Sequence, residues 1–239
     1  MKTSVTPAFG AETLASSVYK KLRREIINSR FPRGQKLRTQ QLCERYGTGL
    51  SPIREALNRL SSDGLVDQND QRGFSLSPLS EEHLNELTRT RCWLNELALR
   101  ESMARGDSTW EENVVLAYHR MSRLPRHLPN NGDNPGWEDA HRTFHSSLIA
   151  ACGSRWLSRF CEQLFDAADC YRHLSRITSA RRKLRKDEHQ EIMDAVLARD
   201  ADKAVKLLLA QFRRTADLAK EKLAMPPSAA SRRPADQGG

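Results

Sequence analysis

Two histidines lie four residues apart on the apolar face of a helix predicted over residues 137–151. The spacing of His141 and His145 directs both imidazoles to one place. His189 and Gln211 fall on the apolar faces of two later predicted helices. A single inward histidine is more often a satisfied core residue, but three that face one cavity can hold a divalent metal on neutral imidazole nitrogens. The pattern therefore predicts a metal site on His141, His145 and His189.

An arginine interrupts the apolar stripe of a long helix predicted over residues 81–105. Arg91 stands between Leu87 and Leu94 in this stripe, so its guanidinium is directed to the core. Because an unpaired buried charge costs several kcal/mol, on the order of the penalty for desolvating an ion, an anion should meet it. The anion is either an internal carboxylate or a bound acid. Alternatively, the long side chain reaches past the core to solvent.

Two more polar residues extend this candidate site. Tyr171 and Arg172 follow the apolar stripe of a helix predicted over residues 155–175, although a solvent-facing position is equally open for Arg172. Together with Arg91 and Gln211, they predict a cavity in a helical bundle that binds a small carboxylate effector beside the metal.

The composition is that of a soluble globular protein. At 239 residues the chain is long enough for two domains, and it lacks the apolar run of roughly 18 residues that a membrane span needs. The N-terminus has no continuous apolar signal core, so we expect a cytoplasmic protein without a membrane partner. Five scattered cysteines without a Cys-x-x-Cys pair indicate reduced thiols. The net charge of +9 is compatible with an acidic polymer as partner.

The hydrophobic pattern predicts a mostly α-helical chain, because strand signals are confined to residues 65–76. We expect an N-terminal domain over 11–78, an all-helical effector-binding and dimerisation domain over 79–224, and a disordered tail over 225–239. Six helices are predicted in the second domain, over residues 81–105, 108–124, 137–151, 155–175, 179–198 and 201–223.

The N-terminal domain combines positive charge with the spacing of a helix-turn-helix. Residues 12–78 contain twelve Lys and Arg against seven Asp and Glu. A first helix is followed by a short helix over 39–45, a glycine turn over 46–49 and a third helix, with Ser51 as N-cap and Pro52 as first residue. Two strands behind the third helix complete a predicted winged helix-turn-helix.

The outer face of the third helix and the wing are the predicted DNA contacts. Because a recognition helix reads base edges near its N-terminus, Arg54 is the first candidate for a bidentate contact with guanine. Arg72 at the tip of the wing suits a phosphate or minor-groove contact. The alternative is a basic helical domain without a nucleic-acid partner. The predicted contacts are Arg38, Thr39, Ser51, Pro52, Arg54, Asn58, Arg59, Arg72 and Gly73.

The stretch GTGLSPIREALNRL at residues 47–60, with the wing dipeptide Arg72-Gly73, resembles the winged-helix domain of GntR-family transcription regulators. The resemblance implies binding to double-stranded operator DNA. One departure is Gly49-Leu50, where the family commonly has Ser-Arg. The operator preference of the wider family therefore does not carry over to this chain.

The resemblance continues through the helical domain. Arg91, the Phe-His pair ending at His145 and the Glu-His pair ending at His189 resemble the FCD effector domain of the FadR branch. That domain commonly holds a metal on one Asp and three His, and an Arg of its first helix reaches the effector carboxylate. By position, His141 replaces the Asp and Gln211 replaces the last His. The resemblance thus implies three imidazoles for zinc or nickel, with Gln as a poor fourth ligand.

The predicted function is that of a homodimeric repressor released by a small organic acid. The segments FHSSLIAACGS and LFDAADCYR further resemble repressors of the CsiR type, which implies a short dicarboxylate such as glutarate as the effector. One alternative is a metal-sensing repressor without an organic effector, which leaves Arg91 unexplained. Another is a three-His metal-dependent hydrolase, which would need a nearby carboxylate, whereas Glu138 is expected to face water.

Overall fold

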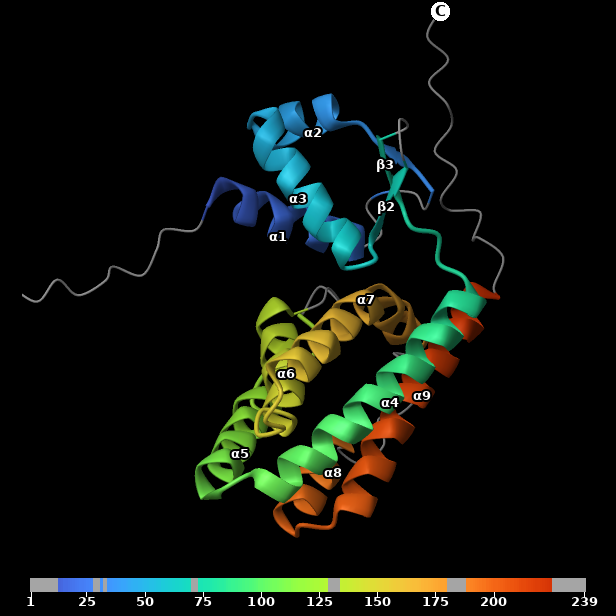
Figure 1. Cartoon of the computed structure of the whole chain (residues 1–239). Coiled ribbons are helices and arrows are strands. Elements are labelled where there is room, and N and C mark those ends of the chain that lie inside the picture. The colour runs from blue at the N-terminus through green and yellow to red at the C-terminus, as the bar shows by residue number, and fades with distance from the viewer. Residues whose placement is uncertain are drawn as a thin grey trace, which may run out of the picture. The chain divides into compact units, whose positions relative to one another are not determined.

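The computed structural model describes residues 13–27, 31, 34–69, 73–128, 134–179 and 188–224. The chain divides into two compact units, the first ending at Pro78 and the second beginning at Leu79. Arg72, residues 11 and 12 and the predicted tail over 225–239 lie outside the described residues. The described part of the chain is mostly helical, as predicted (Figure 1).

The first unit is a winged helix. Its elements are α1 (Leu14–Ile27), β1 (Lys36–Leu37), α2 (Thr39–Tyr46), α3 (Leu50–Ser62), β2 (Val66–Asn69) and β3 (Gly73–Leu76). Apolar residues at helical spacing, such as Leu22 and Ile26 of α1 and Ile53 and Leu57 of α3, are fully buried. Both α1 and α2 pack on α3. The predicted helix-turn-helix followed by a wing is confirmed.

The sheet of the wing contains one strand more than predicted. Lys36 and Leu37 pair antiparallel with Ser75 and Phe74, so the strand order is β1-β3-β2. The expectation of two strands was wrong, because a two-residue strand is too short to show an alternating pattern.

The recognition helix α3 begins at Leu50, with Gly49 as its N-cap. Ser51 and Pro52 are therefore its second and third residues, and their prediction as cap and first residue was wrong. Proline is tolerated throughout the first turn, because the N–H groups there have no partner within the helix. The turn before α3 depends on Gly47, which has a φ of 61°. Glycine adopts this left-handed conformation without strain because it has no Cβ.

The second unit is a helical bundle. Its elements are α4 (Glu81–Arg105), α5 (Ser108–Ser122), α6 (Pro135–Leu148), α7 (Arg155–Ser179), α8 (Glu188–Leu197) and α9 (Ala201–Leu223). Ser80, Asp107 and Asp200 cap α4, α5 and α9, since each side chain accepts a backbone N–H three residues later at 2.9–3.1 Å. α4 and α9 have the predicted bounds.

The other helices of the second unit differ from their predicted bounds. α5 ends at Ser122, two residues before its predicted end, and α6 ends at Leu148, three residues before its predicted end. α6 begins at Pro135, two residues early, because Asn134 accepts the Gly136 N–H at 3.0 Å and proline suits the first helical position. α7 continues to Ser179, past the predicted end at residue 175. Of the helix predicted over 179–198, residues 180–187 lie outside the described part.

The bundle places three helices around the predicted metal ligands. α4, α7 and α9 pack on one another, α8 packs on α9 and α5, and α5 packs on α6 (Figure 1). Phe144, Leu148, Ile192 and Leu208 fill the centre and are almost completely buried. Residues of α6, α8 and α9 that face this core therefore lie close together, although they are far apart in the sequence.

Arg199 joins the turn between α8 and α9 to the turn between α4 and α5. Its guanidinium donates to the carbonyl oxygens of Met103 and Gly106 at 2.7 and 2.8 Å and pairs with Glu111. Its φ of 57° is left-handed, which costs energy for a residue with a Cβ. The contacts satisfy carbonyls at the end of α4 and hold that end of the bundle together.

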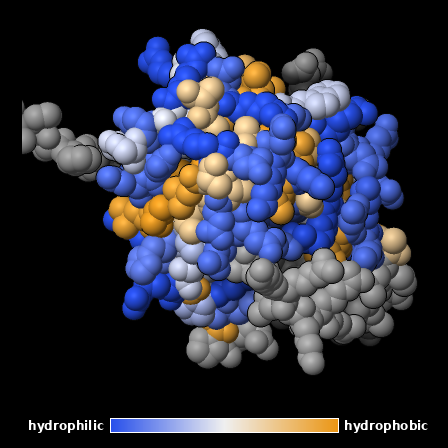
Figure 2. Space-filling view, turned by 90° about the horizontal axis from the view of Figure 1, so that it is seen from below, coloured by the Kyte–Doolittle hydropathy of each residue, from blue (hydrophilic) through white to orange (hydrophobic). Residues whose placement is uncertain are grey.

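The surface of the described residues carries hydrophobic side chains in small groups among hydrophilic ones, as one face shows in Figure 2. Among the described helices, none combines the length and the apolar character needed to cross a membrane.

Candidate effector site and DNA-binding face

Three histidines from two helices meet in the second unit. His141 and His145 of α6 approach each other with 3.1 Å between their Nε2 atoms. His189 of α8 joins them, and one ring nitrogen of each histidine lies within 4.8 Å of those of the other two. Gln211 of α9 contacts His189, with 2.8 Å between the two Nε2 atoms. The structure thus brings together all four residues that the helical spacing directed to one cavity.

Burial keeps the imidazoles of His141 and His145 uncharged. It lowers the pKa of His141 and of His145 well below 6.5, and neighbouring imidazoles and arginines lower each pKa further. Trp137 stacks on the His141 ring with 4.7 Å between ring centroids. The nitrogen lone pairs of His141 and His145 are therefore available to a metal at neutral pH without competition from protons.

The donor set fits a divalent metal that prefers nitrogen. Bonds of about 2.0–2.1 Å from zinc to imidazole in tetrahedral geometry leave the nitrogens roughly 3.4 Å apart. The 3.1 Å separation of His141 and His145 is close to this value, and His189 would need only a small shift. The Gln211 Oε1 atom is buried without a hydrogen-bond partner among the described residues. Three imidazoles would leave a fourth position for this oxygen or for a ligand.

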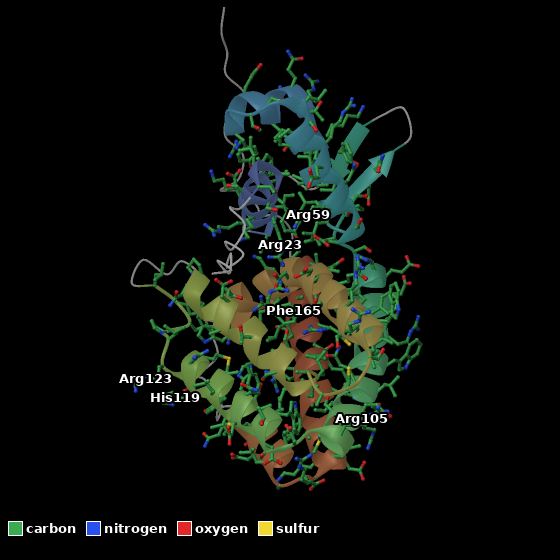
Figure 3. The ribbon with its side chains drawn as sticks, turned by 60° about the vertical axis from the view of Figure 1, so that its left-hand side comes forward. Arg23, Arg59, Arg105, His119, Arg123 and Phe165 are labelled. Atoms are coloured by element: carbon green, nitrogen blue, oxygen red, sulfur yellow. The ribbon has the colours of Figure 1, made fainter. Side chains whose placement is uncertain are left out.

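Arg91 is buried and forms no ion pair among the described residues, although the charge of Asp169 acts on it from a distance. The side chain is 7% exposed, and its Nε has no hydrogen-bond partner among the described residues. The guanidinium carbon lies 3.7 Å from the ring centroid of Phe212 and 5.2 Å from that of Phe165, which Figure 3 labels inside the bundle. Burial, followed by repulsion from Arg172, lowers the pKa of Arg91 to about 10. An anion in this place would relieve both penalties.

Arg172 is buried too, but its charge is neutralised. It pairs with Asp169 on its own helix and with Glu138 of α6 at 2.5 Å, and it contacts the Nδ1 atom of His141 at 3.2 Å. The solvent-facing alternative for Arg172 is therefore wrong. Glu138 is also half-buried in this ion pair, contrary to the expectation that it faces water. The i, i+3 spacing of Asp169 and Arg172 was the signal that sequence reasoning missed.

Tyr171 has a different hydroxyl environment from the one predicted. Its Oη accepts from the Ser80 N–H at 3.3 Å, donates to the Ser80 carbonyl at 3.2 Å and lies 3.0 Å from His83 Nδ1. These contacts fasten α7 to the start of α4. Tyr171 also lines the neighbouring cavity, but its hydroxyl is already engaged by these contacts.

A small cavity of about 20 Å³ lies between α4, α7 and α9, and Arg91, Tyr171 and Arg172 line it together with Thr215 and apolar residues. That volume is roughly the space of one water molecule. A small acid can therefore enter only if the surrounding side chains move.

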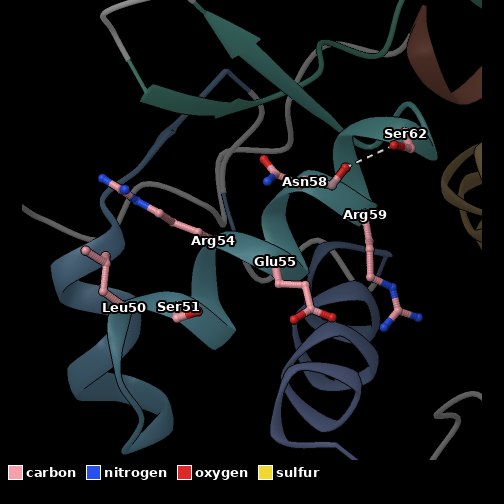
Figure 4. Close-up of a pocket in the computed structure, with 7 residues that line it drawn as sticks. All are labelled: Leu50, Ser51, Arg54, Glu55, Asn58, Arg59 and Ser62. Carbon is pink, nitrogen blue, oxygen red and sulfur yellow. Dashed lines mark hydrogen bonds between the residues drawn. The ribbon is translucent and has the colours of Figure 1, made fainter.

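In the first unit, a groove follows the outer face of α3 (Figure 4). Leu50, Ser51, Glu55, Asn58, Arg59, Ser62 and Arg54 line it. The opposite face of α3 is fully buried in the domain core. Arg54 and Asn58 are exposed, as their predicted role requires, and so is Arg38, which precedes the first residue of α2, Thr39.

Arg59 is the predicted DNA contact that lies least favourably. It points away from Arg54 in Figure 4, its Nη1 donates to Ser16 at 3.1 Å, and its guanidinium stacks on Tyr19 of α1. The half-buried Pro52 shapes the first turn, and Gly73 begins β3 with a φ of 80°.

Both units of the chain match known families. Residues 14–76 match the family described as bacterial regulatory proteins, gntR family, and residues 86–214 match the FCD domain. The chain belongs to the GntR family. This GntR regulator is 36% identical to an uncharacterised HTH-type transcriptional regulator, BphR, of Paraburkholderia xenovorans, over 86% of this chain and 84% of that protein.

Other relatives agree. The chain is 34% identical to the HTH-type transcriptional repressor GlaR of Escherichia coli, over 80% of this chain and 88% of that protein. The structure of E. coli McbR/YncC shares the fold, with a TM-score of 0.71 and 18% identity over 88% of this chain and 99% of that one. The families and relatives are DNA-binding transcription regulators and not enzymes, so the hydrolase alternative is set aside.

Proposed function

We propose that this GntR regulator is a homodimeric repressor that a small organic acid releases from its operator. Each winged helix would place α3 in a major groove, and the twofold axis of the dimer would set the distance between two half-sites. Such a protein would act on chromosomal DNA in the cytoplasm.

Arg91 is the observation that carries the effector half of this proposal. A guanidinium buried against Phe212, with no ion pair to a carboxylate in the described part of the chain, destabilises the ligand-free bundle. The carboxylate of an acid would supply the missing counter-charge. Since the cavity beside Arg91 holds only about 20 Å³, binding would displace the helices around it. α4 begins two residues after Leu79, the first residue of the second unit. A movement of α4 on effector binding would therefore be transmitted along the chain to the winged helix.

The histidine cluster supports a metal next to this acid. His141, His145 and His189 would hold zinc or nickel, and the bound ion would offer an open coordination position to a carboxylate oxygen. Two anchor points, the metal and Arg91, suit a short dicarboxylate such as glutarate.

The first experiment is the melting temperature of the purified protein against short mono- and dicarboxylates, with and without a chelator. An acid at about 100 times its Kd should raise Tm by roughly 5–10 °C. Stabilisation by one chain length that is lost on chelation supports a metal-assisted acid sensor. No shift with any acid contradicts the effector half of the proposal and leaves DNA binding standing.

A metal sensor without an organic effector is the second candidate, because the three imidazoles alone would serve it. Arg91→Leu separates the two functions. A metal sensor should keep its metal-dependent change in operator affinity in this variant, whereas an acid sensor should lose its response to acid.

A further inference from the structure

Leu50 is an apolar side chain that stands exposed on the DNA-binding face. It is 45% exposed, whereas Ile53, Leu57 and Leu60 on the inner face of α3 are fully buried. Among the described residues of the first unit, Leu14 at the start of α1 is the other large apolar residue with comparable exposure, at 56%. Leu50 thus lies outside the buried core of the first unit.

The position of Leu50 is that of a reading residue. It is the first residue of α3, and Arg54 and Asn58 follow it at intervals of one helical turn. Figure 4 shows Leu50 and Arg54 on the same side of α3, where both line the groove, while Arg59 points toward α1. Residues near the N-terminus of a recognition helix are those that reach base edges in the major groove.

The chemistry of an isobutyl group selects one kind of base edge. Leucine can neither donate nor accept a hydrogen bond, so it gains nothing from a phosphate, and it would leave the polar edge of guanine or cytosine without its water. The one apolar group in the major groove is the C5 methyl of thymine. We propose that Leu50 contacts a thymine methyl in each half-site, beside the base pair that Arg54 contacts. This inference rests on the proposed operator binding.

The test removes the methyl group without changing a hydrogen bond. The operator of the full-length protein is first selected from random duplexes, and each thymine is then replaced by deoxyuridine. One thymine position in each half-site should respond to this replacement. Deoxyuridine at that position in a single half-site should lower the affinity of the wild-type protein about fourfold, which corresponds to about 0.8 kcal/mol for one buried methyl. Replacement in both half-sites should cost roughly fifteenfold.

The same duplexes measured with Leu50→Ala isolate the contact. This variant should bind the thymine operator more weakly and lose nothing further with deoxyuridine, because any effect on the duplex itself cancels in the comparison. Leu14→Ala, the matched exposed leucine on α1, should behave as wild type. Selection with Leu50→Arg should return guanine at the same position, since arginine pairs with guanine N7 and O6.

Two negative outcomes have different meanings. If the wild-type protein enriches no sequence, the proposed operator binding is contradicted and the role of Leu50 with it. If an operator emerges but every deoxyuridine costs the wild-type and Leu50→Ala proteins equally, operator binding stands and the thymine contact is overturned.

Discussion

Two buried arginines of the second unit differ in whether their charge is compensated. Arg172 pairs with Asp169 and Glu138, whereas the Nε of Arg91 has no partner among the described residues. The carboxylate of a bound acid can therefore offset the desolvation cost of the Arg91 guanidinium, whereas Arg172 already has carboxylate partners. The i, i+3 spacing of Asp169 and Arg172 was a local signal of this difference, but the partner from α6, Glu138, could not be read from the sequence.

Arg91→Met should make the protein more stable and unresponsive to acid. Replacing an uncompensated buried charge by an apolar side chain of similar length is expected to add about 1–4 kcal/mol to the free energy of unfolding. Urea unfolding with and without the acid measures both effects. Arg172→Met is the matched control, and it should lose about 3–5 kcal/mol, because it removes one partner from the buried ion pairs with Asp169 and Glu138. Equal losses in both variants would show that Arg91 has a counter-ion after all.

Gln211→His should strengthen metal binding. A fourth imidazole beside His189 would complete a set of four nitrogen donors. We expect the zinc affinity to rise about tenfold or more, because substitutions at or beside metal ligands typically change metal affinity by about 10–100-fold. Competition with a chromophoric chelator measures the affinity. Gln211→Leu should still bind zinc through the three histidines, whereas His145→Ala should lose zinc binding. Zinc binding that ignores all three changes would place the metal elsewhere.

At the scale of elements, the first residues of several helices are set by capping side chains that are close in sequence. α4 and α9 could be predicted to the residue because Ser80 and Asp200 cap them. β1 was missed because its pairing with β3 is a tertiary contact of two residues.

Arg199→Ala should loosen one end of the bundle. The side chain supplies charge-assisted hydrogen bonds to the Met103 and Gly106 carbonyls and to Glu111, so its loss should cost about 2–3 kcal/mol in the free energy of unfolding. Thermal and urea unfolding measure the loss. Arg199→Gly, which is free of the strain at a φ of 57°, should be less destabilised than the alanine variant. A neutral alanine variant would mean that the clamp contributes no stability.

At the scale of the whole molecule, acid and operator are expected to compete through linkage. If the acid weakens operator binding by a factor, the operator must weaken acid binding by the same factor, typically about 5–150 in such systems. Titrating operator at saturating acid, and acid at saturating operator, measures both factors. An operator affinity that saturating acid leaves unchanged would contradict the proposed coupling.

Arg54→Ala should lose roughly 1–3 kcal/mol of sequence discrimination while its acid affinity in the absence of DNA stays unchanged.

The sequence by itself determined the helical class, the winged helix and the inward faces on which His141, His145, His189 and Gln211 lie. These features depend on periodicity and caps, which act within a few residues along the chain, so local pattern was sufficient. The outward position of Arg54 followed for the same reason.

Only the tertiary structure decided how these side chains are partnered. Asp169 and Glu138 neutralise Arg172, Ser80 and His83 engage the Tyr171 hydroxyl, and Arg91 is left against aromatic rings. Several of these partners come from different helices, and whether a buried charge is matched depends on atoms brought within a few ångströms by packing. Periodicity tells which face a residue occupies, but it carries no information about what stands opposite.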